Sequence, residues 1–259
     1  MHFVDTHAHL SDPSFARDLD EVLERARASG LLSVLAVSET LADAERNLGL
    51  AATHPEIIRP CAGLHPEFPD LDQAGLVERF VREHRNDLAA IGEVGLDHWL
   101  VQEDEARERQ REIFSTFIDL SLELDLPLNV HSRSAGEKTV ALLLERGARR
   151  VHLHAFDGRA ARALPAVEAG YYFSVPPSVV RSPQKQKLVR RLPLHCLLVE
   201  SDAPVLGPDP RERNEPANVP LALRAISEIH ALALEAVADA VLENTARLYG
   251  EAAKATLFG

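Results

Sequence analysis

Eight short apolar runs, separated by longer segments, dominate this sequence of 259 residues. Their starts lie 20 to 39 residues apart, and the intervening segments show helical spacing, as in Leu19, Val22, Leu23 and Ala26. This alternation favours a single-domain (β/α)8 TIM barrel over 1–259; an open doubly wound sheet is the alternative, but no GxGxxG follows the first run. The predicted strands are Phe3–Asp5, Leu32–Val37, Ile57–Ala62, Ala89–Glu93, Leu128–Val130, Val151–His154, Tyr171–Ser174 and Leu197–Glu200.

Polar side chains gather where these predicted strands end. His7 and His9 are two residues apart, so in an extended chain both project from one face. In a barrel the carboxyl ends of all strands meet at one mouth, which is where chemistry is expected. Because so many imidazoles and carboxylates rarely fall at one mouth by chance, we interpret them as a site. Its further members are His65, Glu93, His131, His154 and Asp202.

Imidazole and carboxylate without thiolate are the ligands typical of an open catalytic site for zinc, manganese or iron. Four histidines and two carboxylates are too many for one tetrahedral ion and suit two ions. Two neighbouring ions need a bridging ligand, and Glu93 lies between the histidine pairs in chain order. We therefore predict Glu93 as the bridge, with Gly92 and Gly95 giving room for close approach. Asp97 is expected to brace the following loop or a ligand.

Several basic residues are candidates for phosphate contacts. His65 is expected close enough to contact the scissile phosphate or leaving group, and it need not be a ligand. Arg133 offers a fork of donors to phosphate, with a surface salt bridge as the alternative. Arg181, Lys185 and Lys187 are candidates for contacts to an anionic substrate, although such a charge run is more often a solvated helix face.

The remaining aromatic and polar residues have more ordinary interpretations. Trp99 is either a stacking surface for a base or a cover over a loop. His152 is expected to be hydrogen-bonded in the barrel interior, and Asp5 to orient an imidazole. Four other histidines are expected to be solvated and away from the strand ends: His54, His84, His195 and His230.

Composition limits the partners and the compartment. The net charge of −12 argues against a broad grip on nucleic acid, but a metal site can still receive phosphate. No stretch is long and apolar enough for a membrane span, and MHFVDTH lacks the features of a signal peptide. Cys61 and Cys196 lie in apolar runs, so we expect buried free thiols in a reducing cytoplasm. We infer no obligatory protein partner.

Seven motifs, in this order, resemble the TatD family of metal-dependent deoxyribonucleases. They are DTHAHL from Asp5, GLHP from Gly63, IGEVGLD from Ile91, NVHSR from Asn129, LHAF from Leu153, ESDAP from Glu200 and RNEPAN from Arg213. Together they span nearly the whole chain. This sequence departs from the family's bacterial prototype at Ala155, where the prototype more often has Cys, and at His98, where it more often has an aromatic residue.

The resemblance implies a binuclear site in an amidohydrolase-like TIM barrel. His7, His9, Glu93 and Asp202 would hold one divalent ion, and Glu93, His131 and His154 the other, as magnesium, manganese or zinc. It also implies hydrolysis of DNA, often from a 3′ end or in single strands. We expect Asp202 to orient the attacking water and accept its proton.

Two other functions remain open from the sequence. Related barrels hydrolyse C–N or ester bonds on similar sites, and phosphomonoesters or aminoacyl-tRNA are further substrates of that class. Many such relatives carry a lysine at the end of strand four, where this chain has Glu93. A non-catalytic metal-binding or nucleic-acid-binding module is the third interpretation, and the excess of ligands and the acidic charge argue against it.

Overall fold

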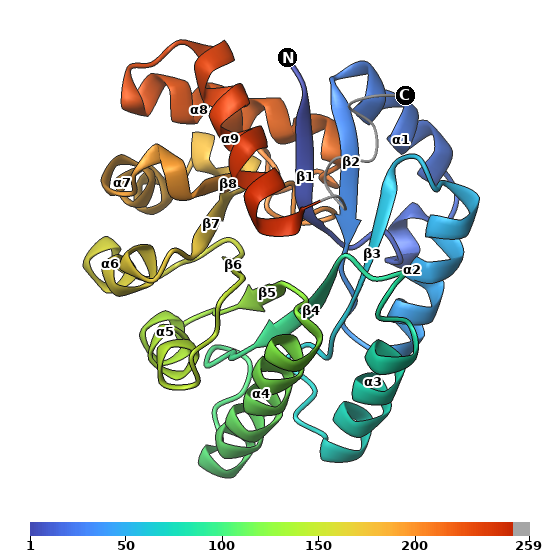
Figure 1. Ribbon diagram of the computed structural model, residues 1–259. Helices are drawn as coiled ribbons and strands as arrows, with labels where there is room; N and C mark the ends of the chain where they lie inside the picture. The colour runs from blue at the N-terminus through green and yellow to red at the C-terminus, as the bar shows by residue number, and fades with distance from the viewer. Residues whose placement is uncertain (251–259) are drawn as a thin grey trace.

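The computed structural model describes residues 1–250 as a barrel of eight parallel strands surrounded by helices (Figure 1). Each strand pairs with the next one along the chain. The predicted (β/α)8 fold is therefore confirmed, while 251–259 of the predicted domain lie outside the described residues. The strands are β1 Phe3–Ala8, β2 Leu31–Ala36, β3 Ile58–Ala62, β4 Ala90–Gly95, β5 Leu128–His131, β6 Val151–Leu153, β7 Tyr172–Val175 and β8 Leu197–Val199.

The barrel closes where the segment after β8 meets β1. The amide of Asp202 donates to the carbonyl of His7 at 2.9 Å, and the amide of His9 donates to the carbonyl of Ala203 at 2.8 Å. These bonds hold β1 extended as far as Ala8, three residues beyond its predicted end. His7 therefore lies within the strand, and the other strand ends differ from prediction by two residues at most.

Nine α-helices within residues 1–250 surround the strands. Helix α1 buries Val22, Leu23 and Ala26 against the barrel, as its spacing predicts. Helix α4 ends at Leu124 because Asp125 adopts a left-handed conformation, two residues before Pro127. The helices are α1 Leu19–Ala28, α2 Leu41–Thr53, α3 Leu71–Glu83, α4 Asp104–Leu124, α5 Gly136–Glu145, α6 Ala160–Glu168, α7 Pro183–Arg191, α8 Val219–His230 and α9 Leu234–Tyr249. Four short 3-10 helices join them: Pro13–Phe15, Pro177–Val180, Leu194–Cys196 and Pro216–Asn218.

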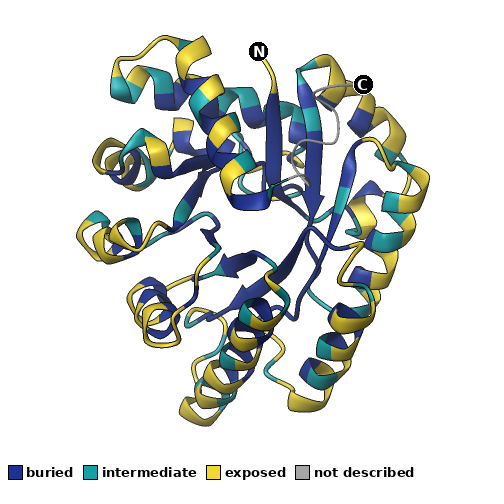
Figure 2. Cartoon of the chain, viewed as in Figure 1, coloured by how far each residue is buried: buried dark blue, intermediate teal, exposed yellow. Residues whose placement is uncertain are grey.

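The strands are buried throughout most of their length, and the surrounding helices are exposed on their outer faces (Figure 2). Cys61 and Cys196 are both buried and free, as expected. Within residues 1–250, none of the helices has the length and apolar character needed to cross a bilayer. The rigid framework places the end of each strand at a common mouth, and the candidate site is built there.

Candidate metal centre

A cavity of about 510 Å³ opens at the carboxyl ends of the strands. Its volume lies within the usual range for small-molecule sites. His7 lies beneath the cavity floor and is fully buried, whereas the other predicted site residues except Arg181 line the wall. Those residues are His9, His65, Glu93, His131, Arg133, His154 and Asp202.

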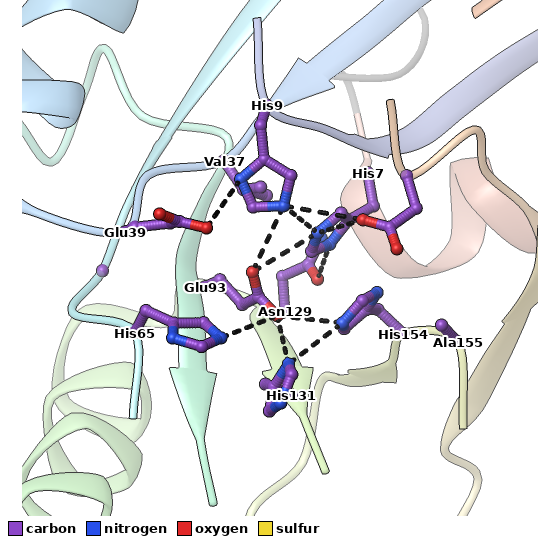
Figure 3. A network of polar contacts seen from close by, with 12 residues as sticks. His7, His9, Val37, Glu39, His65, Glu93, Asn129, His131, His154 and Ala155 are labelled. Carbon is purple, nitrogen blue, oxygen red and sulfur yellow. Dashed lines mark hydrogen bonds and ion pairs between the residues drawn. The ribbon is translucent and has the colours of Figure 1, made fainter. Parts of the chain in front are cut away.

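Glu93, in β4, lies at the centre of the cluster (Figure 3). One carboxylate oxygen, Oε2, lies 3.5 Å from Nε2 of both His7 and His9. The other oxygen, Oε1, lies 2.6 Å from Nδ1 of His131 and 2.9 Å from Nε2 of His154. The same side chain thus presents one oxygen to each pair of histidines, which is the arrangement a bridging carboxylate requires.

Five of the distances between donor atoms in the first set are close to those between ligands of one ion. Nitrogen and oxygen ligands about 2.0–2.1 Å from a tetrahedral ion lie about 3.3 Å from one another. Here the Nε2 atoms of His7 and His9 are 3.2 Å apart, and each lies 3.5 Å from Oε2 of Glu93. Oδ1 of Asp202 lies 3.6 Å from Nε2 of His7 and 3.5 Å from that of His9. These five distances match the spacing of ligands around one ion.

The second set has three donors, Oε1 of Glu93, Nδ1 of His131 and Nε2 of His154. The two nitrogens are 3.4 Å apart, and all three donor atoms belong to a group able to hold a metal ion. A three-residue set leaves coordination positions free for water or substrate, as catalytic sites do. Both sets are rich in imidazole and carboxylate, so their chemistry suits a divalent cation.

Electrostatics keep the carboxylates of this cluster ionised. Burial alone would raise the pKa of Glu93, but positive charge on neighbouring imidazoles, His154 foremost, lowers that pKa well below its usual value. Burial likewise opposes ionisation of Asp202, and a hydrogen bond from His9 together with nearby imidazoles lowers its pKa. A cation bound between these groups would favour the same charge state.

Asn129 and Glu200, each two positions before a candidate ligand in the chain, lie beside the rings of His7 and His154 in a deeper layer. Oδ1 of Asn129 lies 2.8 Å from Nδ1 of His7, which turns Nε2 of that ring toward Glu93. Oε2 of Glu200 lies 3.5 Å from Nδ1 of His154. Sequence reasoning missed both roles. Their signal was present, since alternate residues of a strand share one face.

Asp97 braces both a ligand and a loop, as predicted. Its Oδ2 lies 2.9 Å from Nε2 of His131, so the other ring nitrogen faces Glu93. Its Oδ1 accepts hydrogen bonds of 2.7 Å from the amides of Trp99 and Leu100. Asp97 thus couples the orientation of His131 to the loop that follows β4.

The prediction that Asp5 orients an imidazole was wrong. Oδ1 of Asp5 accepts hydrogen bonds from the backbone amides of His7 and Ser201, and Oδ2 has no hydrogen-bond partner among residues 1–250. Asp5 therefore positions backbone and does not orient an imidazole. His152 is a hydrogen-bonded interior residue, as predicted. Its two ring nitrogens lie 2.7 Å from the Tyr249 hydroxyl and 2.6 Å from that of Ser174.

Two glycines beside Glu93 are required by close backbone contacts. A Cβ at Gly92 would lie 2.6 Å from the Cβ of Asn129. Gly95 has a φ of 147°, and a Cβ there would lie 2.0 Å from the carbonyl oxygen of His131. The prediction that glycines allow strands to approach at this site is therefore confirmed.

His65 and Arg133 line the cavity beside the metal cluster, and Trp99 contacts Arg133. Nε2 of His65 lies 4.0 Å from Oε1 of Glu93, and burial lowers the pKa of this histidine to about 4. The guanidinium of Arg133 lies over the Trp99 ring, 5.2 Å from its centroid. This is a cation–π contact, which differs from the surface salt bridge that was the alternative interpretation of Arg133.

The basic residues Arg181, Lys185 and Lys187 follow β7, and they do not all face the cavity. Lys185 lines the cavity, whereas Lys187 is exposed on α7. Residues two apart on a helix face away from each other, so one charge run supplies both environments. Arg181 does not line the cavity, and its Nε donates to the carbonyl of Gly207 at 3.2 Å. Its contact with substrate stays a prediction.

The cavity wall also contains Glu39, which sequence reasoning missed. Its Oε1 lies 3.7 Å from Nδ1 of His9, so the other ring nitrogen faces the cluster. Glu39 follows β2, an apolar run for which no motif was identified. The histidines expected to lie elsewhere do so: none of His54, His84, His195 and His230 lines the cavity.

Comparisons with known proteins show which family this chain is similar to. The family model for TatD related DNase matches residues 4–250. TATDN3 from Mus musculus is 44% identical over 260 residues, covering 95% of this chain and 87% of that protein. The Homo sapiens protein named deoxyribonuclease TATDN3 is 41% identical over 257 residues, covering 95% and 94%.

The fold is also shared with a solved structure. The crystal structure of the TatD homologue YjjV from Escherichia coli K12 has a TM-score of 0.87 at 27% identity, and the match covers 95% of this chain and 97% of that one. The family match, the relatives and the solved structure each cover nearly the whole chain. The chain therefore belongs to the TatD-related DNase family.

Proposed function

We propose that this protein is a deoxyribonuclease that hydrolyses phosphodiester bonds at a binuclear divalent metal centre. The observation that carries the proposal is the position of Glu93, whose two oxygens face two separate sets of donors. Relatives over nearly the full chain are named deoxyribonuclease or metal-dependent hydrolase, and they support the same activity.

The side chains divide into two ligand sets that share Glu93. His7, His9, Glu93 and Asp202 would hold one ion, whereas Glu93, His131 and His154 would hold the other. Bound divalent ions of this kind polarise a phosphoryl oxygen and lower the pKa of a bound water. Magnesium, manganese and zinc all suit this set of nitrogen and oxygen donors.

Asp202 is proposed to accept the proton of the attacking water. Its lowered pKa leaves it ionised at neutral pH, so it can act as a hydrogen-bond acceptor and base. The hydrogen bond from its amide to the carbonyl of His7 fixes the backbone beside the histidine pair. Asp202 therefore stands on a rigid part of the barrel closure.

His65 and Arg133 are proposed to contact the substrate. His65 is neutral at physiological pH and lies beside Glu93, where it can donate a hydrogen bond to the phosphate or the leaving oxygen. Arg133 is exposed at the mouth and can bind a neighbouring phosphate with its fork of donors. Together with Trp99 it offers a stacking surface for an unpaired base, which favours single-stranded DNA or a 3′ end.

The test uses protein stripped of metal and reloaded separately with magnesium, manganese or zinc. Each form is assayed on single-stranded DNA labelled at the 3′ end, on a phosphomonoester and on a panel of amides and esters. We expect chelator-sensitive release of nucleotides from DNA. Hydrolysis of the amides or esters without cleavage of DNA would identify the C–N or ester hydrolase instead.

A further inference from the structure

Lys185 stands out among the charged side chains of the cavity. Of the residues that line it, six are carboxylates and only two, Arg133 and Lys185, carry a permanent positive charge. Arg133 already lies against the Trp99 ring, on the side of the mouth formed by β4 and β5. Lys185 comes from α7, which follows β7, so it supplies positive charge from a separate part of the wall.

The position of Lys185 is fixed by contacts to the loop after β6. Its Nζ donates to the carbonyl of Ala155 at 3.3 Å, and Ala155 directly follows His154. The neighbouring Gln184 donates from its amide to the carbonyl of Asp157 in the same loop. The hydroxyl of Ser182 accepts from the amide of Lys185 and caps the helix. Helix α7 is thereby docked so that this lysine faces the metal cluster.

The ammonium of Lys185 has donor capacity left for a ligand. Lysine carries three N–H donors, and the bond to Ala155 uses one of them. No carboxylate in residues 1–250 forms an ion pair with it within 4.0 Å, although Glu200, Asp202 and Asp157 act on it electrostatically. Burial lowers its pKa, since a charge without a close counter-ion is unfavourable in the wall of a cavity. An anionic ligand would supply that partner.

We propose that Lys185 binds the non-bridging oxygens of the substrate phosphate and makes the site selective for phosphate esters over uncharged esters and amides. The proposal rests on the proposed function in taking a phosphate ester as substrate. Lys185 acts as a fixed positive charge and hydrogen-bond donor, and no proton leaves it. Asp202, on the same side of the mouth, lies within its electrostatic reach.

The chain offers a matched control for this lysine. Lys187 lies two residues further along α7 and is exposed to solvent, so Lys187→Met removes the same charge from the same helix outside the cavity. Lys185→Met and Lys185→Gln remove the charge from the wall by two different side chains. Lys185→Arg keeps the charge and should preserve binding.

The experiment measures the dissociation constant of inorganic phosphate for each metal-loaded protein by calorimetry, together with metal content. Loss of a charge-assisted hydrogen bond should weaken phosphate binding about tenfold or more in Lys185→Met and Lys185→Gln. Lys187→Met should change it less than about twofold, and Lys185→Arg should stay within about threefold of the original protein. Metal content should be unchanged in all four variants.

The salt dependence of KM gives a second measurement. In Lys185→Met, the slope of log KM for DNA against log salt should fall by about one. Unchanged phosphate affinity in the two neutral variants with metal retained, or absence of phosphate binding in the original protein, would overturn the proposal. If the original protein binds phosphate through Lys185 but cleaves no DNA, the proposed deoxyribonuclease activity fails while the role of Lys185 stands.

Discussion

The side-chain oxygen of Asn129 lies 2.8 Å from Nδ1 of His7, and both side chains are fully buried. The amide nitrogen of Asn129 donates to the carbonyl of Thr6 at 2.9 Å, which settles which end of the amide faces the ring. His7 therefore donates from Nδ1 and presents its free Nε2 to the cluster. This bond between β5 and β1 prepares the ring to bind a cation.

Replacing Asn129 with Ala should weaken metal binding by about 10- to 100-fold, because His7 loses the partner that fixes its ring. The change should also lower the free energy of unfolding by about 1–3 kcal/mol, since a buried donor is left unpaired. Metal titration and chemical denaturation measure the two effects. Asn218→Ala removes an amide away from the cavity and serves as the control. Equal metal affinity in both variants would contradict the role of Asn129.

Replacing Glu93 with Ala should remove bound metal and DNA hydrolysis together, because both donor sets lose an oxygen. We expect activity to fall by a factor of about 1,000 or more. Elemental analysis and a nuclease assay on the same preparation test this. Glu67→Ala removes a carboxylate from the cavity rim and should retain the metal. Full activity in a Glu93 variant without metal would exclude the binuclear mechanism.

Replacing Asp202 with Asn should lower kcat by about 100- to 10,000-fold, because the amide cannot accept the proton of the attacking water. The shape of the side chain is kept, so we expect the melting temperature to change little. Steady-state kinetics and thermal unfolding separate the two effects. Hydrolysis at a near-normal rate would show that another group accepts the proton.

Replacing Trp99 with Ala should raise the KM for single-stranded DNA several-fold, because a stacked base is worth about 1–3 kcal/mol. The KM for a small phosphodiester without a base should change little. Leu232→Ala removes an exposed apolar side chain outside the cavity and is the matched control. If both substrates are affected equally, Trp99 acts by supporting the loop.

The two cysteines should resist modification in the folded protein. Burial raises the pKa of Cys196 to about 12 and that of Cys61 further, so neither forms thiolate near neutral pH. A thiol reagent at pH 8 should label neither residue in native protein and both after denaturation. Mass spectrometry counts the labels. Rapid labelling of the native protein would show that one of these segments opens readily.

The sequence by itself determined the barrel and the candidate ligands. Apolar runs alternate with helical spacing, and burial of strands on both faces needs such runs. His7, His9, Glu93 and Asp202 could be identified because each lies near the end of a run, and parallel strands place those ends together. The sequence did not show which oxygen of Glu93 faces which histidines, because a strand pattern does not specify side-chain rotamers.

The tertiary structure alone decided which neighbours act on the site. Lys185 and Lys187 belong to one basic run, and only the docking of α7 on the loop after β6 turns Lys185 into the cavity. Glu39 reaches His9 from another strand end, and Asn129 reaches His7 across the barrel. These contacts join residues far apart in the chain, whereas local spacing encodes only which face a side chain occupies.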